Sequence, residues 1–425
     1  MSAETRVKVE AGLRSRYARE RRFRLYGLLS VAFGLVFLIF LLTTIVGNGW
    51  TAFRQTAVLL EVDFSAEIID PDGRRDPDQL MAADYQALVK AALAQRFPGV
   101  TERKERRQLA ALMSDGAAYE LRDLVMADPA LIGRRESLWL PASDDVDLLV
   151  KGHVERDAAI GGQLSPAQLA WMDVLEAKGM LELRLNRIFF SSGDSREPEL
   201  AGIWGAAKGS FFMLLVTLVL SFPLGVAAAI YLEEFAPASR WVDLIEVNIN
   251  NLAAVPSIVF GLLGLAVFIN FFGLPRSAPV AGGLVLTLMT LPVIIIASRA
   301  SIKSVPPSVR EAALGIGASQ IQTVFHHVLP LAMPGMLTGA IIGMERALGE
   351  SAPLLMIGMV AFIVDVPQSP FDPSTALPVQ IYLWADSPER AFVERTSAAI
   401  MVLLAFLLVM NVAAVWLRSR FERRW

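Results

Sequence analysis

Residues 304–335 read SVPPSVREAALGIGASQIQTVFHHVLPLAMPG and form a polar segment between two long apolar stretches of the chain. Pro306 and Pro307 stand near its start. Proline is favoured in the first turn of a helix, because its fixed φ suits that position and its missing N–H is not needed there. Ser308 is a suitable N-cap residue, since its hydroxyl accepts from a backbone N–H. The segment therefore predicts a short helix that begins just outside an apolar stretch.

The rest of the segment predicts a turn and a second short helix. Residues 311–314, EAAL, are strong helix formers, and Gly315 and Gly317 interrupt them. Ser319 is placed to cap a second helix, and Pro330 is expected to end it. We therefore expect two short helices joined by a glycine turn. On physical grounds alone, an ordinary solvated hairpin explains this pattern equally well.

The apolar stretches on either side of this hairpin indicate a membrane protein. Of the 425 side chains, 54% are hydrophobic and 19% are charged, whereas soluble domains average about 25% charged residues. A helix needs about 20 apolar residues to cross the hydrocarbon core of a bilayer. The expected transmembrane helices are 26–46, 210–231, 251–272, 278–296, 331–347 and 398–416.

Basic residues at both ends of the chain predict its topology. Arginine and lysine are concentrated in residues 1–25 and again in residues 418–425, and such flanks stay in the cytoplasm. Six crossings return the chain to its starting side, so we expect both termini and the hairpin in the cytoplasm. The loop 233–247 is acidic although it falls on that side. The positive-inside rule depends mainly on lysine and arginine and little on acidic residues, so the acidic loop does not change the predicted topology.

Residues 47–201 have the composition of a water-soluble domain on the far side of the membrane. Acidic side chains outnumber basic ones there, and the segment is long enough to bury its own core. Its apolar patterns predict an α+β fold. The expected strands are 56–64 and 181–190, and the expected helices are 85–97, 103–113 and 166–175. No motif indicates what this domain does.

Composition and motif content exclude several classes of protein. The sequence has no cysteine, which excludes disulfides and thiolate metal sites, and its three histidines lack the spacing of a helical metal site. A net charge of −3 gives no basic surface for nucleic acid. The phosphate-binding pattern GxxxxGK[ST] does not occur, so any ATP is expected to bind another polypeptide. We therefore expect no cofactor in this chain and no enzymatic activity of its own.

The spacing within the hairpin resembles the EAA loop of the permease subunits of bacterial ABC importers. In that family the loop docks into a cleft of the cytoplasmic ATPase, and the resemblance implies the same contact here. His327 departs from the family, which usually has an aliphatic residue at this position. The matching positions, to which the resemblance assigns ATPase coupling, are Glu311, Ala312, Ala313, Gly317, Leu329 and Pro330.

A second stretch narrows the resemblance to phosphate permeases of the PstA type. Residues 346–355, RALGESAPLL, are similar to the RAxGETAPLL signature of that family. Residues 251–261 and 224–232 resemble further signatures of the same family. The likeness covers residues 201–425 and the first span. It does not extend to residues 47–201, which the core family does not require.

Arg346 and Glu350 are the candidate residues of a substrate pathway. Ionisable groups inside a span are costly and usually face a bundle interior or a transport path. Their i, i+4 spacing allows them to pair, and Gly349 and Pro353 break the helix beyond them. A guanidinium matches two oxygens of an oxyanion, and the adjacent carboxylate weakens its hold enough for release. A purely structural ion pair is the alternative.

The resemblance implies a fold, a location and a set of partners. The fold is an all-α polytopic membrane protein of about six transmembrane helices, the ABC importer permease fold, with an inserted α+β soluble domain. The partners are a second, homologous permease subunit, an ATP-binding subunit dimer on the cytoplasmic side and an external phosphate-binding protein, all at the bacterial inner membrane. The expected segments are 1–25 (basic, cytoplasmic), 26–46 (first span), 47–201 (periplasmic domain), 202–417 (permease core with the loop 304–335) and 418–425 (basic, cytoplasmic).

The expected function is that of a permease subunit in ATP-driven phosphate import, which forms half of the translocation pathway. An importer of another oxyanion, such as molybdate, sulfate or phosphonate, is the alternative, because a change of substrate leaves the coupling loop unaltered. Two other classes fit less well. A membrane sensor needs a cytoplasmic signalling domain, and a membrane hydrolase needs a nucleophile near Arg346 and Glu350; the sequence predicts neither.

Overall fold

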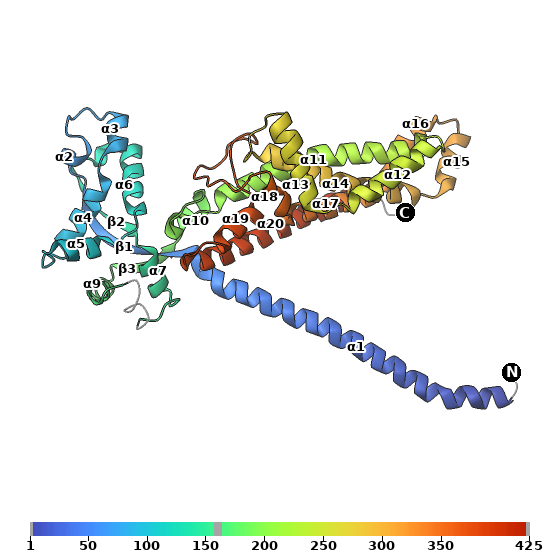
Figure 1. Ribbon diagram of the computed structural model, residues 1–425, viewed down its shortest axis with the longest axis horizontal. Helices are drawn as coiled ribbons and strands as arrows, with labels where there is room; N and C mark the ends of the chain where they lie inside the picture. The colour runs from blue at the N-terminus through green and yellow to red at the C-terminus, as the bar shows by residue number, and fades with distance from the viewer. Residues whose placement is uncertain (1–2, 157–163, 422–425) are drawn as a thin grey trace.

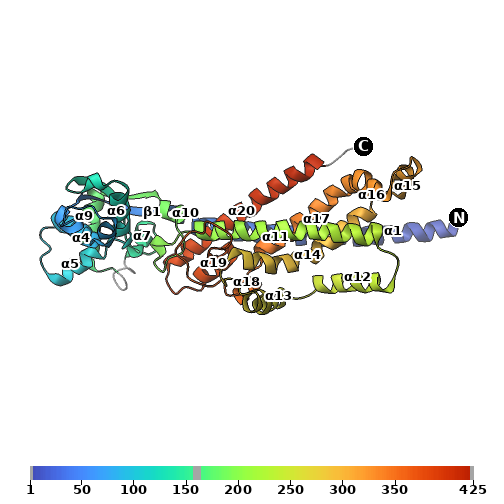
Figure 2. The ribbon, with the colours of Figure 1, turned by 90° about the horizontal axis from the view of Figure 1, so that it is seen from above.

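The computed structural model describes residues 3–156 and 164–421. The expected basic ends, 1–25 and 418–425, are therefore described only from residue 3 and up to residue 421. A small mixed domain, the outer domain, lies at one end of the molecule, and an elongated bundle of long helices makes up the rest (Figures 1 and 2).

Five helices in the described part of the chain are long and apolar enough to cross a membrane. A bent pair of helices gives a sixth crossing if the pair is counted as one span. The five are α1 (Ala3–Gly49), α11 (Trp204–Ile230), α14 (Pro279–Lys303), α17 (Leu329–Gly349) and α20 (Ala391–Phe421). With the small sheet of the outer domain, this confirms the predicted fold class, an all-α polytopic membrane protein with an inserted α+β domain.

The expected span 251–272 is not one continuous helix, so that prediction is wrong. Helix α12 (Arg240–Ala253) ends within it, and the chain then starts α13 (Ser257–Gly264) in a new direction. The two directions differ by 101°. Pro256 explains the break, because proline lacks an N–H group and disfavours helical geometry in the residue before it. Beyond α13 the chain continues as a π-helical segment, Leu265–Phe271.

The centre of the bundle is formed by α11, α14 and α17, with α14 packed against both of the others. Small residues set the distance between these helices. A Cβ atom on Gly283 of α14 would come within 2.8 Å of the Met213 carbonyl oxygen in α11, and one on Gly339 of α17 would overlap Ala297. The close contact of backbones at small residues is typical of packing between transmembrane helices.

Helix α1 diverges from the bundle along most of its length (Figure 1). None of the residues in its most apolar window is buried. Near its end it meets α20, where a Cβ on Gly49 would come within 2.7 Å of the backbone of Ser397 and Ala398. Because the apolar surface of α1 is bare, we expect lipid or another protein to cover it.

The outer domain is built on a three-stranded antiparallel sheet in the order β2–β1–β3. Val58 of β1, which is buried, pairs with Leu140 on one side and with Leu181 on the other. The strands are β1 (Arg54–Asp63), β2 (Arg135–Pro141) and β3 (Leu181–Leu185). The helices are α2 (Ala66–Ile69), α3 (Pro77–Ala82), α4 (Tyr85–Arg96), α5 (Arg103–Ala110), α6 (Gly116–Ala127), α7 (Asp144–Val150), α9 (Pro166–Ala177) and α10 (Arg187–Ser191).

Most expected elements of the outer domain are confirmed. The first predicted strand and the three predicted helices correspond to β1, α4, α5 and α9. The prediction of a strand through residues 181–190 is wrong beyond Leu185. Asn186 accepts a hydrogen bond from the Phe189 N–H (3.0 Å) and so caps α10, which ends the strand. The sequence pattern does not predict β2 or α6.

A buried cluster of charges joins the outer domain to the bundle. Lys151, directly after α7, contacts Asp147 (Nζ–Oδ2, 2.6 Å) and Glu394 of α20 (Nζ–Oε1, 2.9 Å). The Lys151 side chain is 0% exposed, and both carboxylates are buried as well. Asp147 also accepts from the backbone N–H of Thr56 (2.7 Å). Buried charges persist only with their partners in place, so this junction cluster (Lys151, Asp147 and Glu394) fixes the outer domain on α20.

Candidate functional site

Arg346 and Glu350 form an ion pair at the end of α17, as their i, i+4 spacing predicts. Arg346 Nε lies 3.6 Å from Glu350 Oε1. Helix α17 ends at Gly349, so Glu350 is the first residue beyond the helix, with an extended backbone. The Arg346 side chain is 43% exposed. Its guanidinium is therefore open to a ligand on that face of the helix, and this pathway pair stays the candidate for substrate contact.

The chain beyond the pathway pair packs against α13. It forms the short helix α18 (Ala352–Met356). A Cβ on Gly261 of α13 would come within 2.7 Å of Pro353 Cα, so only glycine fits between the two helices. Two stretches that the sequence singles out, 251–261 and 346–355, therefore contact each other in the fold.

The hairpin predicted from residues 304–335 has two short helices and a glycine turn. Gly317 forms the turn with a φ of +89°, which glycine adopts without strain. The Ser319 hydroxyl accepts from the Gln322 N–H, and the Gln322 side chain accepts from the Ser319 N–H (2.9 Å). This capping box confirms the role predicted for Ser319. The hairpin elements are α15 (Pro307–Gly315), α16 (Gln320–Thr323) and the π-helical segment Val324–Val328.

Two details of the expected hairpin are wrong. Ser308 does not cap α15, because the helix already begins at Pro307 and Pro306 holds the cap position without a side-chain bond. Pro330 does not end the second helix. A wider π-helical turn carries the chain straight into α17, and this local change in the hydrogen-bond pattern accommodates Pro330 near the start of α17.

The six residues expected to couple to an ATPase lie in different surroundings. Glu311, Ala312 and Gly317 are exposed, Ala313 is buried, and Leu329 and Pro330 are half-buried at the start of α17. Along α17, Arg346 is about 26 Å from Leu329. The fold therefore does not bring the pathway pair and the coupling residues together. Large apolar side chains are also exposed on the hairpin, namely Leu314, Ile316, Ile321 and Phe325.

A network of charges that the sequence patterns do not predict lies at the base of the hairpin. Glu233, in the π-helical segment Tyr231–Phe235 that continues α11, contacts Arg299 of α14 and also Lys303 (3.3 Å). Arg299 makes a further contact with Glu246 of α12. The acidic character of the loop 233–247 is thereby explained, because its carboxylates face basic side chains of α14. Acidic residues on a side where the topology predicts basic ones are the signal that points to this network.

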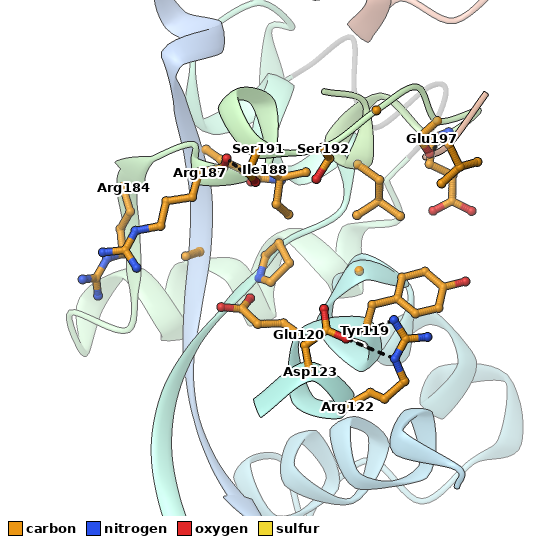
Figure 3. Close-up of a pocket in the computed structure, with 18 of the residues that line it drawn as sticks. Tyr119, Glu120, Arg122, Asp123, Arg184, Arg187, Ile188, Ser191, Ser192 and Glu197 are labelled. Carbon is orange, nitrogen blue, oxygen red and sulfur yellow. Dashed lines mark hydrogen bonds and ion pairs between the residues drawn. The ribbon is translucent and has the colours of Figure 1, made fainter. Parts of the chain in front are cut away.

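A cavity of about 1110 Å³ lies where the outer domain meets the loop beyond α18 (Figure 3). Burial raises the pKa of Glu120 on its wall, and the nearby positive charge of Arg187 opposes that shift. Phe362 and Val364 of the loop complete the lining. The charged residues of the wall are Glu120, Arg122, Asp123, Arg184, Arg187, Asp194, Arg196 and Glu197. Because both signs are equally represented, the cavity shows no preference for an anion. The part of the chain that the structure describes holds no group of three or more acidic or histidine residues placed to bind a metal ion.

Family models match two parts of the sequence. Residues 221–425 match the model described as binding-protein-dependent transport system inner membrane component. Residues 10–160 match a domain of unknown function, DUF3333. A solved structure of the MetNI methionine ABC transporter in inward-facing conformations aligns with a TM-score of 0.43 and 19% identity, over 52% of this chain and 98% of that chain.

Curated relatives match the part that holds the bundle. The probable ABC transporter permease protein YqgI of Bacillus subtilis is 33% identical, over 56% of this chain and 84% of that protein. The phosphate transport system permease protein PstA 1 of Mycobacterium tuberculosis is 33% identical, over 54% and 74%. PstA of Haemophilus influenzae is 28% identical, over 57% and 85%. The chain therefore belongs to the family of binding-protein-dependent transport system inner membrane components, the permease subunits of ABC importers.

Proposed function

We propose that this chain is a permease subunit of an ATP-driven phosphate importer and forms half of its translocation pathway. The observation that carries the proposal is the pathway pair, Arg346 and Glu350, at the broken end of α17. Two relatives that share this part of the chain are named phosphate transport system permease proteins. Phosphate presents pairs of oxygens that match the forked donors of a guanidinium.

The geometry of the pathway pair suits a transient anion site. A separation of 3.6 Å is longer than a good hydrogen bond, so Glu350 orients the Arg346 guanidinium without occupying its donors. The carboxylate also repels an anion that binds beside it. A transport site needs such moderate binding, because the substrate has to leave as well as enter.

An importer for another oxyanion is the second candidate. Sulfate, molybdate and phosphonate share the paired oxygens that a guanidinium recognises. The two relatives named above by their substrate are phosphate permeases, which favours phosphate. The substrate therefore has to be decided by competition between these anions.

We place the partner ATPase at the hairpin. Leu314, Ile316 and Ile321 are exposed there among polar residues, and an exposed apolar patch with a polar rim is typical of a protein contact. In this proposal the ATP-binding subunit dimer covers that patch and holds the ATP. A second, homologous permease subunit completes the pathway, and an external phosphate-binding protein delivers the substrate.

The placement of the chain ends supports the proposed orientation. The first described residues of α1, the last of α20 and the hairpin all lie at one end of the molecule, and the outer domain lies at the other (Figures 1 and 2). Basic residues near both chain ends favour the cytoplasm. We therefore propose a bacterial inner-membrane protein with cytoplasmic termini and with residues 47–201 in the periplasm.

The test is uptake of labelled phosphate at low external concentration, in cells that lack this chain and carry a variant of it. We expect the wild type to restore uptake and Arg346→Ala to lower it at least about tenfold, because the bidentate donor is lost. Arg346→Lys keeps the positive charge but loses the planar pair of N–H donors, so an intermediate rate of phosphate uptake is expected. Arg135→Ala, which removes an exposed cation of the outer domain, is the matched control and restores uptake fully.

Two outcomes contradict parts of the proposal. Full uptake by Arg346→Ala, at an equal amount of protein in the membrane, reduces the pathway pair to a structural contact. Unlabelled sulfate and molybdate serve as competitors in the same assay. If either competes better than unlabelled phosphate does, the assigned substrate is wrong and the second candidate takes its place.

A further inference from the structure

Arg310 of α15 is directed back toward the bundle. Its Nη2 and Nε lie 2.7 Å and 3.1 Å from Oε1 of Glu234, in the π-helical segment that continues α11. Nη1 donates to the carbonyl of Val305 (2.8 Å), and Nη2 donates to the carbonyl of Ile302 (3.0 Å). A single side chain therefore joins three elements, namely α15, the end of α11 and the end of α14.

The partners of Arg310 are groups that need a donor. Ile302 lies in the last turn of α14, and Val305 lies just beyond the end of that helix. The Ile302 carbonyl already accepts from the Val305 N–H (3.2 Å), and carbonyls at a helix C-terminus, together with the helix dipole, attract a further positively charged donor. The Glu234 side chain is 9% exposed, so its charge also needs a partner. The planar fork of arginine serves the carboxylate and both carbonyls at once.

The neighbouring glutamate makes the corresponding contact within the bundle. Glu233 contacts Arg299 of α14, which also contacts Glu246 of α12. Two adjacent residues of the π-helical segment that continues α11 thus bind different parts of the molecule, Glu233 the bundle and Glu234 the hairpin. Gln320 of α16 donates to the backbone carbonyl of Glu234. The end of α11 therefore contacts both helices of the hairpin and, through Arg299, the bundle.

Arg310 and the next residue in the chain differ in exposure. Glu311 is exposed, which leaves it accessible to a partner protein. Arg310 is about three-quarters buried, with its guanidinium held against the bundle. Apolar contacts of Val305, Val309 and Val324 also hold the hairpin base together, but such contacts have no directional preference. The hydrogen bonds of Arg310 therefore fix the angle at which the hairpin leaves the bundle.

We propose that the hairpin-base pair, Arg310 and Glu234, transmits movement of the hairpin to α11 and α14, and that Arg310 is a positioning residue for the coupling of ATP hydrolysis to transport. The inference rests on the proposed function. When the ATPase displaces the hairpin, the bonds of Arg310 move the ends of α11 and α14 with it. Without those bonds the hairpin stays attached through its apolar contacts, but its angle to the bundle is no longer fixed.

The first test measures the angle of the hairpin and does not depend on the substrate. Because the chain has no cysteine, spin labels are attached to cysteines introduced at Ser308 in α15 and Leu224 in α11, which are both exposed. In the assembled complex we expect a narrow distribution of label distances with Arg310 present. In Arg310→Gln the distribution should be at least about twice as wide. Equal widths overturn the inference, whatever anion is transported.

The second test measures phosphate uptake per ATP hydrolysed in reconstituted vesicles. In Arg310→Gln we expect this ratio to fall about tenfold while ATP hydrolysis stays within about twofold of the wild type. The exchange of Arg310→Glu with Glu234→Arg rebuilds the ion pair and should recover part of the ratio. Arg240→Gln, which removes an exposed cation of α12, is the matched control and leaves the ratio unchanged.

The two tests separate failure of the inference from failure of the proposed function. If Arg310→Gln loses hydrolysis and uptake in equal proportion, the residue serves assembly and the inference is wrong. If the wild-type complex hydrolyses ATP without importing phosphate, the proposed substrate is wrong. In that case the widths of the label distances still decide whether the hairpin-base pair fixes the hairpin.

Discussion

The outer junction and the base of the hairpin both use charged side chains to hold a polar extension on the transmembrane helices, but they differ in exposure to water. At the outer junction, Lys151 is fully buried between two carboxylates. At the hairpin base, Arg310 stays partly exposed, and beyond it the hairpin carries bare apolar side chains such as Ile316. The outer junction is therefore closed within this chain, whereas the hairpin leaves apolar side chains exposed where we propose that the ATPase binds.

The outer junction is thus a permanent contact within the chain, whereas the contact proposed for the hairpin is with a separate protein. Breaking a buried ion pair is costly, because the remaining charges stay buried without a partner, so the outer domain and α20 are expected to move as one body. At the hairpin base, Arg310 is 24% exposed and Glu234 is 9% exposed, so breaking this pair also leaves a largely buried charge without its partner. The pair therefore holds the hairpin in one orientation, while the exposed apolar side chains beyond it remain available to the proposed ATPase.

The largest effect is expected from Lys151→Met, which leaves two buried carboxylates unpaired. We expect a loss of about 3–5 kcal/mol in the free energy of unfolding, seen as a large fall in the melting temperature of the purified protein in detergent. Arg135→Met is the control, because it breaks the exposed pair with Asp63 and should cost under about 1 kcal/mol. Equal losses from the two variants would show that the outer junction is not a closed interface.

Glu199, which lies between the outer domain and α11, is expected to make the free energy of unfolding depend on pH. The effect should be similar in size to that of Lys151→Met. Burial raises its pKa from 4.5 to about 7. The folded state therefore binds more protons than the unfolded state between these values, and this contribution to stability falls as the pH rises from about 4.5 to about 7. Glu199→Gln removes the dependence and should stabilise the protein by about 3 kcal/mol at pH 8.

The measurement for Glu199→Gln is the melting temperature at pH 5 and at pH 8, compared with the wild type. The gain should be large at pH 8 and small at pH 5, where Glu199 is already protonated in the folded state. Asp78→Asn is the control, because Asp78 is an exposed acidic residue of the outer domain. Its effect on the melting temperature should be the same at pH 5 and pH 8. A gain that is the same at both pH values contradicts the role of burial.

A smaller effect, confined to the hairpin, is expected from Gly317→Ala. The positive φ of Gly317 costs an alanine about 1–2 kcal/mol. Gly315→Ala is the matched control, since both glycines have open space around them but Gly315 lies in α15 with helical backbone, where alanine is favoured. Hydrogen exchange of the hairpin amides should be faster in Gly317→Ala and slower in Gly315→Ala. Faster exchange in both variants would assign the effect to volume instead of backbone geometry.

The smallest effect on the isolated chain is expected from Ile316→Ser. Ile316 is 83% exposed, so its replacement should leave the melting temperature unchanged. Its burial by the proposed ATPase is worth about 1.4 kcal/mol, so the affinity for that partner should fall about tenfold. Leu185→Ser, at an exposed position of the outer domain, should alter neither quantity. Unchanged affinity in Ile316→Ser places the contact elsewhere.

Local patterns predict the parts of this structure that depend on neighbours in the sequence. The lengths of the apolar stretches predict five of the long helices, and the capping pattern at Ser319 predicts the start of α16. The i, i+4 spacing predicts the contact between Arg346 and Glu350. In each case the partners are within one turn of a helix, or the signal is the number of apolar residues in a row.

Contacts between distant segments are not predicted, because no local pattern encodes them. Lys151 and Glu394 belong to different parts of the chain, and neither stands out before the fold brings them together. Pro256 bends the chain, whereas Pro330 is accommodated by a π-helical turn in a continuing helix. Both residues are prolines, so whether the helix breaks or continues at each of them depends on the packing around it.

The burial of Lys151 has a consequence for the order of events during synthesis. The core of the outer domain consists of residues that precede α11, so this core can close while the ribosome still makes the bundle. Lys151 then lacks its partner Glu394, which is translated roughly 10–50 s later at common elongation rates. In that interval the Lys151 side chain of the nascent domain lacks one of its two carboxylate partners. Helix α20 therefore completes the junction of a domain whose own core has already closed.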